Sequence, residues 1–356
     1  MQYRLSLTLL TLWIALISTP IMLAQTIPKG HQVVKAEKQP RGSFGSDIKY
    51  SPDGRILAAV SFFGFGEVML YDTKSEETLE NFANPKWVTT IAFRPDSKIL
   101  ATGHHDGTVQ LWDTGDIDQG IGLRDRLGEA GILSGHKATV NSIAYSPDGK
   151  WMASGSQDKT VRLLDANTGE HIRTLSGHRG AVYSVAFRPD SKILAAASWG
   201  SVYLWETNTG RKLRELDQRP IVKADTPHIY TVAFSPDGNT IVTGGFYGTL
   251  FLWDVDTGRR LRRFNQTPKV RIEMASLYRV AFSPDGNTIA GTNFGHIYLW
   301  DANTTREPKI LSRQGFSSSV TFSPDGKRVA SIGQSEIIMW DTITGQRIYT
   351  KMYIGY

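Results

Sequence analysis

A short turn-forming phrase recurs seven times along the chain, and this repeat constrains the fold more than any other feature of the sequence. Each copy contains Pro-Asp followed by Gly or Ser. Proline fixes φ, and Asp before Gly or Ser favours a tight reversal of the backbone. Reversals of one kind at a regular period predict a repeat architecture. The copies begin at Ser51, Arg94, Ser146, Arg188, Ser235, Ser283 and Ser323.

Strand-like segments flank every copy of the phrase. The residues before it alternate in polarity, as at Val232 and Phe234, which is the period of a β-strand. Further along each repeat, a strand ends in an aromatic–acid pair or a close relative of one. The closing acid lies 18 to 21 residues after the first residue of the phrase. This spacing predicts an all-β, seven-bladed β-propeller with four antiparallel strands per blade over residues 43–356. The pairs are Tyr71-Asp72, Trp112-Asp113, Leu164-Asp165, Trp205-Glu206, Trp253-Asp254, Trp300-Asp301 and Trp340-Asp341.

The chain resembles the WD-repeat family over nearly all of residues 43–353. Gly135-His136 and Gly177-His178 match the Gly-His mark of the family, and four Trp-Asp pairs match its name. A second propeller family, found with bacterial envelope transport, shares the Ser-Pro-Asp-Gly turns but explains neither mark.

The resemblance implies that a blade is pinned by a histidine, a strand Ser or Thr, a turn Asp and a tryptophan. No blade carries all four in its sequence, since Leu164 replaces the tryptophan of the third blade and the second lacks a Gly-His pair. We therefore expect apolar burial to supply most of the rigidity. The resemblance implies structural roles for Asp106, Trp112, His136, Asp158, His178, Trp205, Trp253, Trp300 and Trp340.

The first 24 residues are typical of a signal peptide. Arg4 gives a basic start, an apolar stretch follows, and Ala24 is a small residue suited to the cleavage position. An uncleaved membrane anchor is the alternative. The chain has no cysteine, so export would leave its stability to packing rather than to disulfides. We expect a bacterial, exported protein, periplasmic or extracellular, with no membrane span after the signal is removed.

Two segments compete to complete the last blade. Within residues 25–42, His31–Ala36 could lend a strand to it, as often happens in the family. Arg347–Tyr353 also has the pattern of a fourth strand. We expect the N-terminal segment to join the closing blade, either beside the C-terminal strand or in its place.

Aromatic residues gather in the turns between the second and third strands of the blades. Because turns and long connections at one end of the blades carry binding in repeat proteins, these aromatics are candidate contacts for a partner. The alternative is that the rings pack between blades and replace the missing pins. The candidates are Phe65, Trp199, Tyr247 and Phe294.

Arginines concentrate in the predicted outer strand of the fifth blade. One interpretation is a basic rim that binds an anionic partner, such as an acidic protein or an envelope component. The other is edge protection, because basic side chains keep an exposed strand from pairing with another molecule. The basic rim comprises Arg259, Arg260, Arg262 and Arg263.

These features predict a non-enzymatic scaffold that binds a protein or peptide through one face of the propeller. A glycan-binding propeller or a propeller enzyme, a hydrolase or a dehydrogenase, is the alternative. An enzyme would need acids, a metal or a cofactor in the central channel, where Asp47 and Glu273 are isolated candidates. We expect no cofactor, no metal and a monomer. The net charge of +6 is modest, so we expect no nucleic-acid partner.

Overall fold

The computed structural model divides the chain into residues 1–41 and a unit of residues 42–356. The expected signal peptide and His31–Ala36 lie outside the described residues. The structure describes residues 47–61, 67–82, 87–115, 132–133, 135–218, 228–248, 250–264, 276–293, 296–312, 317–333 and 336–352.

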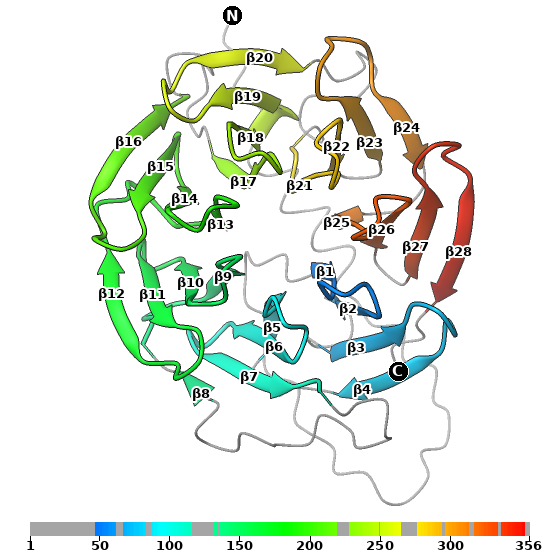
Figure 1. The fold of residues 1–356 in the computed structure, drawn as a ribbon, viewed down its shortest axis with the longest axis horizontal. Helices are drawn as coiled ribbons and strands as arrows, with labels where there is room; N and C mark the ends of the chain where they lie inside the picture. The colour runs from blue at the N-terminus through cyan, green and yellow to red at the C-terminus, as the bar shows by residue number, and fades with distance from the viewer. Residues whose placement is uncertain are drawn as a thin grey trace, which may run out of the picture. The chain divides into compact units, whose positions relative to one another are not determined.

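Seven four-stranded antiparallel sheets surround a central axis, and each is built from four consecutive strands (Figure 1). The predicted seven-bladed propeller is confirmed. We call the strands of a blade a to d, from the axis outward. The first three blades contain β1 (Asp47–Tyr50), β2 (Ile56–Ser61), β3 (Glu67–Asp72), β4 (Thr78–Phe82), β5 (Val88–Phe93), β6 (Ile99–His104), β7 (Val109–Asp113), β8 (Ile132–Leu133), β9 (Val140–Tyr145), β10 (Trp151–Ser156), β11 (Val161–Asp165) and β12 (His171–Leu175).

The remaining four blades follow the same plan, with one short 3-10 helix in the b–c turn of the fifth. They contain β13 (Ser184–Phe187), β14 (Ile193–Ala197), β15 (Ser201–Glu206), β16 (Lys212–Asp217), β17 (Ile229–Phe234), β18 (Thr240–Gly245), η3 (Phe246–Gly248), β19 (Leu250–Asp254), β20 (Arg260–Phe264), β21 (Arg279–Phe282), β22 (Thr288–Thr292), β23 (Ile297–Asp301), β24 (Lys309–Ser312), β25 (Ser317–Phe322), β26 (Arg328–Gly333), β27 (Glu336–Asp341) and β28 (Arg347–Met352).

The recurring phrase forms the turn between strands a and b. In the first blade, Ser51 Oγ donates to Asp53 Oδ1 over 2.6 Å, and Gly54, at a φ of 75°, donates its amide to the Ser51 carbonyl. Two copies end in Ser instead of Gly, and Ser97 and Ser191 adopt φ values of 60° and 63°. This conformation is unfavourable for a residue with a Cβ. Each of these hydroxyls accepts an amide from the preceding blade at 3.1 Å, which offsets the cost.

Apolar packing between neighbouring blades forms the core. Each sheet contributes side chains from both faces, so the buried residues divide into clusters that each join adjacent blades. One cluster joins the last blade to the first, with Ile48 and Met69 packing against Ala330, Ile332 and Met339. The ring therefore closes through side-chain packing between β1–β3 and β26–β27.

The fourth strand of the last blade comes from the C-terminus. β28 pairs with β27 along Ile337–Trp340, which confirms the strand pattern of Arg347–Tyr353 over Arg347–Met352. The expected role of residues 25–42 in the closing blade remains a prediction, because these residues lie outside the described ones. Tyr349 Oη donates to the Glu76 carbonyl of the first blade over 3.3 Å, which adds a polar contact across the closing seam.

Candidate functional site

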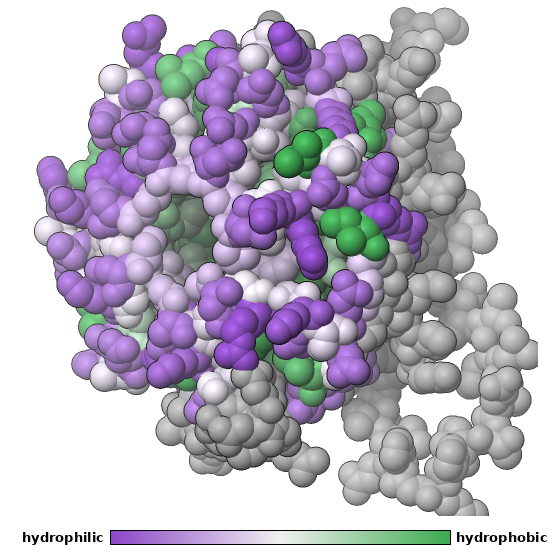
Figure 2. All heavy atoms as spheres, turned by 45° about the vertical axis from the view of Figure 1, so that its right-hand side comes forward, coloured by the Kyte–Doolittle hydropathy of each residue, from purple (hydrophilic) through white to green (hydrophobic). Residues whose placement is uncertain are grey.

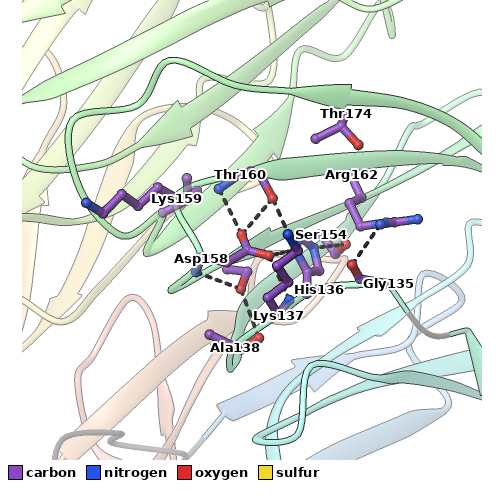
Figure 3. A network of polar contacts seen from close by, with 12 residues as sticks. Gly135, His136, Lys137, Ala138, Ser154, Asp158, Lys159, Thr160, Arg162 and Thr174 are labelled. Atoms are coloured by element: carbon purple, nitrogen blue, oxygen red, sulfur yellow. Dashed lines mark hydrogen bonds and ion pairs between the residues drawn. The ribbon is translucent and has the colours of Figure 1, made fainter.

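A polar network in the third blade has the members that the resemblance implied, apart from the tryptophan (Figure 3). His136 Nδ1 lies 2.9 Å from Asp158 Oδ2, and His136 Nε2 lies 2.8 Å from Ser154 Oγ. Asp158 also accepts the Lys137 amide at 3.0 Å and the Thr160 hydroxyl at 2.6 Å. The network ties the d–a connection to strand b and to the b–c turn.

The same three side chains have the connectivity of a Ser-His-Asp hydrolase triad, but a nucleophile must be reachable by substrate. Ser154 is only 1% exposed. Burial lowers the pKa of His136 and outweighs its bond to Asp158, so the imidazole is neutral at pH 7. Partial burial acts to raise the pKa of Asp158, but bonds from Thr160, Lys137 and His136 hold it at about 2. The network joins His136 and Asp158, the two residues of this blade for which the resemblance implies a structural role, to Ser154.

Two blades complete a pin with one residue each that the sequence pattern did not reveal. In the second blade, Thr102 Oγ1 accepts Trp112 Nε1 at 2.9 Å and lies 2.9 Å from Nε2 of His104, which is fully buried. In the fifth blade, Thr243 Oγ1 accepts Trp253 Nε1 at 3.0 Å and a bond from Gln218 Nε2. His104 and Gln218 thus contact the strand b hydroxyl that corresponds to the one that the Gly-His histidine His136 contacts in the third blade. Asp106 accepts the Thr108 amide and hydroxyl within its own turn.

The fourth blade keeps the histidine and the tryptophan but lacks the hydroxyl between them. Ala196 occupies the strand b position that corresponds to Ser154 in the ladder. Among the described residues, His178 Nε2, Tyr203 Oη and Trp205 Nε1 are buried without a hydrogen-bond partner. Burial lowers the pKa of His178 to about 4, so the ring is neutral. Aromatic contacts hold the group, with the His178 and Tyr203 centroids 4.8 Å apart.

In the last two blades the tryptophans serve as core side chains. Trp300 and Trp340 are 1% and 2% exposed. Gly291 occupies the position of the pin hydroxyl in the sixth blade, and a Cβ there would lie 2.8 Å from the Trp300 ring. The tryptophan therefore fills the space of the missing side chain.

Four aromatic rings in mutual contact lie where strand a begins in blades four to six, and a tryptophan of the b–c turn of the fourth blade adjoins them. We call Tyr183, Trp199, His228, Tyr230 and Tyr278 the aromatic cluster. The Tyr230 centroid lies 5.3 Å from Tyr183, 5.8 Å from His228 and 5.7 Å from Tyr278. Trp199 forms a β-bridge with His228. Because strand a begins at the end of the blade where strands b and c meet, all five residues share one face, which we call the top face.

The aromatic cluster is accessible and uncharged. Trp199 is 37% exposed, and the other four are partly exposed. Burial raises the pKa of Tyr230 to about 12, also raises those of Tyr183 and Tyr278, and lowers that of His228. The four rings are therefore neutral at pH 7. Aromatic groups of this kind, partly exposed and joined across three blades, suit a protein contact.

The predicted aromatic contacts are only partly described. Trp199 belongs to the cluster, whereas Phe65 and Phe294 lie outside the described residues. The backbone of Tyr247 lies in η3, but its side chain is also outside them. His228 and the three clustered tyrosines were missed by the sequence reasoning. A signal was present, since the tyrosines stand at the same offset, five residues before the phrase, in three consecutive blades.

The basic rim contributes to the joints between blades. Arg262 donates to the Ala302 and Asn303 carbonyls of the sixth blade, the latter at 2.9 Å. Arg214 reaches the Thr257 carbonyl of the fifth blade at 3.0 Å in the same way. Arg260 lies over the Phe251 ring, 5.4 Å from its centroid. Arg259 and Arg263 are exposed, so for them an anionic partner stays a prediction.

Asp47, one of the two isolated carboxylates, is enclosed by three blades. It is 1% exposed and lies in β1. Its Oδ1 accepts the Ser319 hydroxyl of the last blade at 2.9 Å and Lys49 Nζ at 3.1 Å. Its Oδ2 accepts the Thr90 hydroxyl of the second blade at 3.0 Å and the Ile91 amide at 3.3 Å. Both oxygens are therefore occupied within the fold. Glu273 lies outside the described residues.

The described residues contain no group of three His, Asp or Glu side chains placed to hold a metal ion. Nor do they contain a helix with the length and apolar character needed to cross a membrane.

Comparison with known families matches four parts of the chain to the WD domain, G-beta repeat. The matched residues are 76–113, 129–165, 169–206 and 220–254. The first three matches run from the outer part of one blade to the end of strand c in the next, so the family repeat straddles two sheets, whereas the fourth begins after β16 and ends with strand c of the fifth blade. The recurring turns of the first, sixth and seventh blades lie outside the matched residues.

Several curated proteins are similar to this chain. The small ribosomal subunit protein RACK1 of Caenorhabditis elegans is 31% identical over 175 residues, which cover 47% of this chain and 50% of that protein. A probable cytosolic iron-sulfur protein assembly protein 1 of Candida glabrata is 34% identical over 85 residues, covering 24% and 25%. The WD repeat-containing protein SL1-17 of Schistosoma mansoni is 31% identical over 122 residues, covering 34% and 36%. The matches thus span half or less of these relatives. All three are eukaryotic, so they give no support to the expected bacterial, exported origin.

Proposed function

We propose that this seven-bladed propeller, four parts of which match the WD domain, G-beta repeat, acts as a non-enzymatic scaffold. It would bind a protein or peptide partner through the aromatic cluster on its top face. The observation that carries the proposal is the continuity of the cluster across blades four to six. A surface that spans three rigid blades holds its rings in fixed positions, so binding costs little side-chain entropy.

Three features support a protein contact at this place. Trp and Tyr are enriched among the residues that dominate binding energies. The rings are neutral at pH 7 and half-buried, so their desolvation by a partner is inexpensive. One similar protein is named as a small ribosomal subunit protein, which is a part of a larger complex. The Ser154–His136–Asp158 network of the third blade is too buried to act on a substrate.

The experiment compares capture of binding proteins by the full chain and by variants of the cluster. Trp199→Ala and Tyr230→Ala should each reduce capture of the same proteins at least tenfold. Their melting temperatures should stay within a few degrees of the wild type, since both side chains are partly exposed. Ile343→Ala is the matched control, because Ile343 is 85% exposed and lies in the c–d turn, at the opposite end of the blades. Equal capture by all three variants would refute the proposal.

We also propose that the protein is exported, on the basis of the signal-like residues 1–24. The N-terminus of the mature protein, read by mass spectrometry after expression with the native leader, tests this. A cut near Ala24 supports export, and an intact Met1 in the cytosolic fraction contradicts it.

A further inference from the structure

One position of strand a recurs in every blade around the central channel, and in most blades its side chain makes a hydrogen bond to the neighbouring blade. It is the residue four positions before the start of each recurring phrase, and we call these seven residues the channel ring. In three blades a hydroxyl of the ring accepts the amide of the next blade's strand a: Ser142 from Val185 at 3.1 Å, Ser184 from Val232 at 3.3 Å and Thr231 from Val280 at 3.0 Å. Thr90 and Ser319 instead donate to Asp47. The channel ring comprises Asp47, Thr90, Ser142, Ser184, Thr231, Arg279 and Ser319.

Arg279 is the exception in the channel ring. A guanidinium has only donors, so it cannot accept an amide as the hydroxyls do. Arg279 is half-buried, and among the described residues it has no hydrogen-bond or ion-pair partner. An arginine is seldom left unpaired in a half-buried position, because its donors lose water there. Its five donors therefore remain available to a ligand.

Lys49 adds a second cation to the channel wall. It stands two residues before the phrase, where the other blades have Ala or Thr. Ala186, Ala233 and Ala281 at this position line a cavity that opens at the a–b turns. Figure 2 shows a hollow with a hydrophobic lining at the centre of one face. The Lys49 side chain is 35% exposed, and its Nζ lies 3.1 Å from Oδ1 of Asp47 in the channel ring.

The channel therefore carries an excess of positive charge. Burial of Asp47 acts to raise its pKa, but the charges of Lys49 and Arg279 and the bonds from Ser319 and Ile91 lower it overall, so the carboxylate is ionised. One negative charge, already saturated with hydrogen bonds, faces two positive charges. Lys49 contacts Asp47 directly, and Arg279 occupies the channel-ring position of the sixth blade, separated from Asp47 only by Ser319 of the last blade.

We propose that Arg279 and Lys49 form an anion site in the central channel that binds a carboxylate of the protein partner. This inference rests on the proposed function, because Arg279 directly follows Tyr278 of the aromatic cluster, so the site continues that surface inward. A carboxylate can take two parallel bonds from a guanidinium, and a lysine adds a point charge. The partner is therefore a peptide segment with an Asp, a Glu or a C-terminus that enters the channel beside the tyrosines.

The probe is fluorescein-labelled octaglutamate with an amidated C-terminus, titrated against the full chain at low salt with anisotropy as the readout. We expect saturable binding of octaglutamate and none of octaglutamine. Arg279→Gln and Lys49→Gln should each weaken binding about tenfold, the effect of losing about 1.4 kcal/mol. Arg279→Lys should retain part of the affinity, since the charge remains without the planar fork.

Arg263→Gln is the matched control, because it removes the same charge from an exposed site on the outer rim. It should leave the affinity nearly unchanged. The inference is overturned if the wild type does not bind octaglutamate. It is also overturned if Arg263→Gln weakens binding as much as Arg279→Gln, which would place the acidic probe on the rim. A drop in melting temperature for Arg279→Gln without any loss of binding would assign Arg279 to stability and overturn it as well.

The two proposals fail separately. If Trp199→Ala reduces capture of the partner while Arg279→Gln leaves octaglutamate binding unchanged, the scaffold function is supported and the channel site is refuted. If octaglutamate binding needs Arg279 while Trp199→Ala and Tyr230→Ala leave capture intact, the top-face function falls.

Discussion

Removal of the Asp47 carboxylate should open the ring at its closing seam. Asp47→Ala leaves the hydroxyls of Ser319 and Thr90 and the Ile91 amide without their acceptor. Each buried group left unpaired costs about 1–3 kcal/mol, and the costs are not additive. Breaking a buried charged group from its partners costs about 3–5 kcal/mol in total, which we take as the expected loss. At about 2 °C per kcal/mol for a large domain, the melting temperature should fall by roughly 6–10 °C.

Two further variants calibrate this loss. Asp47→Asn keeps one acceptor oxygen and the same shape, so it should lose about half as much stability. Thr231→Val removes the single inter-blade bond that the Val280 amide makes at the same position of the fifth blade, and should cost about 1–2 kcal/mol. Hydrogen exchange, followed by mass spectrometry, locates the damage. In Asp47→Ala it should accelerate in β1, β5 and β25 and not in the opposite blades.

The pH dependence provides an independent check. The folded-state pKa of Asp47 is lowered, so its contribution is present above the unfolded value of about 3.9 and is lost as the pH falls through the folded value. The stability difference between wild type and Asp47→Asn should therefore shrink below pH 4. If Asp47→Ala destabilises the protein no more than Thr231→Val, or if exchange rises evenly around the ring, Asp47 does not act as the closing contact.

Three further predictions concern the pins and the rim. Asp158→Asn should cost about 1–2 kcal/mol at pH 7 in urea unfolding, and the difference should vanish between pH 4 and pH 2, because the folded pKa is about 2. Ala196→Ser should stabilise the protein by about 1 kcal/mol by giving His178 and Trp205 a hydroxyl partner; an unchanged or lower melting temperature would contradict this. Arg262→Ala should cost about 1–2 kcal/mol because it frees two carbonyls of the sixth blade, whereas Arg263→Ala should be neutral within about 0.5 kcal/mol in the same melts.

The fold was predictable because its signal is repeated. A single Pro-Asp-Gly turn is weak evidence, but seven copies at nearly one spacing leave few alternatives to four-stranded blades. The pin of the third blade could be expected from the sequence, because His136 and Asp158 occupy positions that belong to the family pattern. The pins of the second and fifth blades could not, because His104 and Gln218 reach the same hydroxyl from other positions in the chain.

The candidate site was only partly predictable for a geometric reason. Trp199 stood out as an aromatic in a turn, where a large exposed ring is unusual. Tyr183, Tyr230 and Tyr278 lie in or next to strand a, where alternation alone makes them resemble core residues. Only the curvature of the ring brings tyrosines from successive blades within 6 Å of one another. The role of Arg262 between blades likewise depends on which turn of the next blade lies opposite, and no local pattern carries that information.

The contiguity of each blade has a consequence for how the chain reaches its native state during synthesis. Every sheet can form as soon as its own four strands have left the ribosome, since all of its partners are near in sequence. The contact between Asp47 and Ser319 is different, because it joins residues 272 positions apart. The apolar surface of the first blade, with Ile48 and Met69, must therefore wait uncovered until the last blade is made. Until then, this exposed apolar surface can bind a chaperone or cause the nascent protein to aggregate.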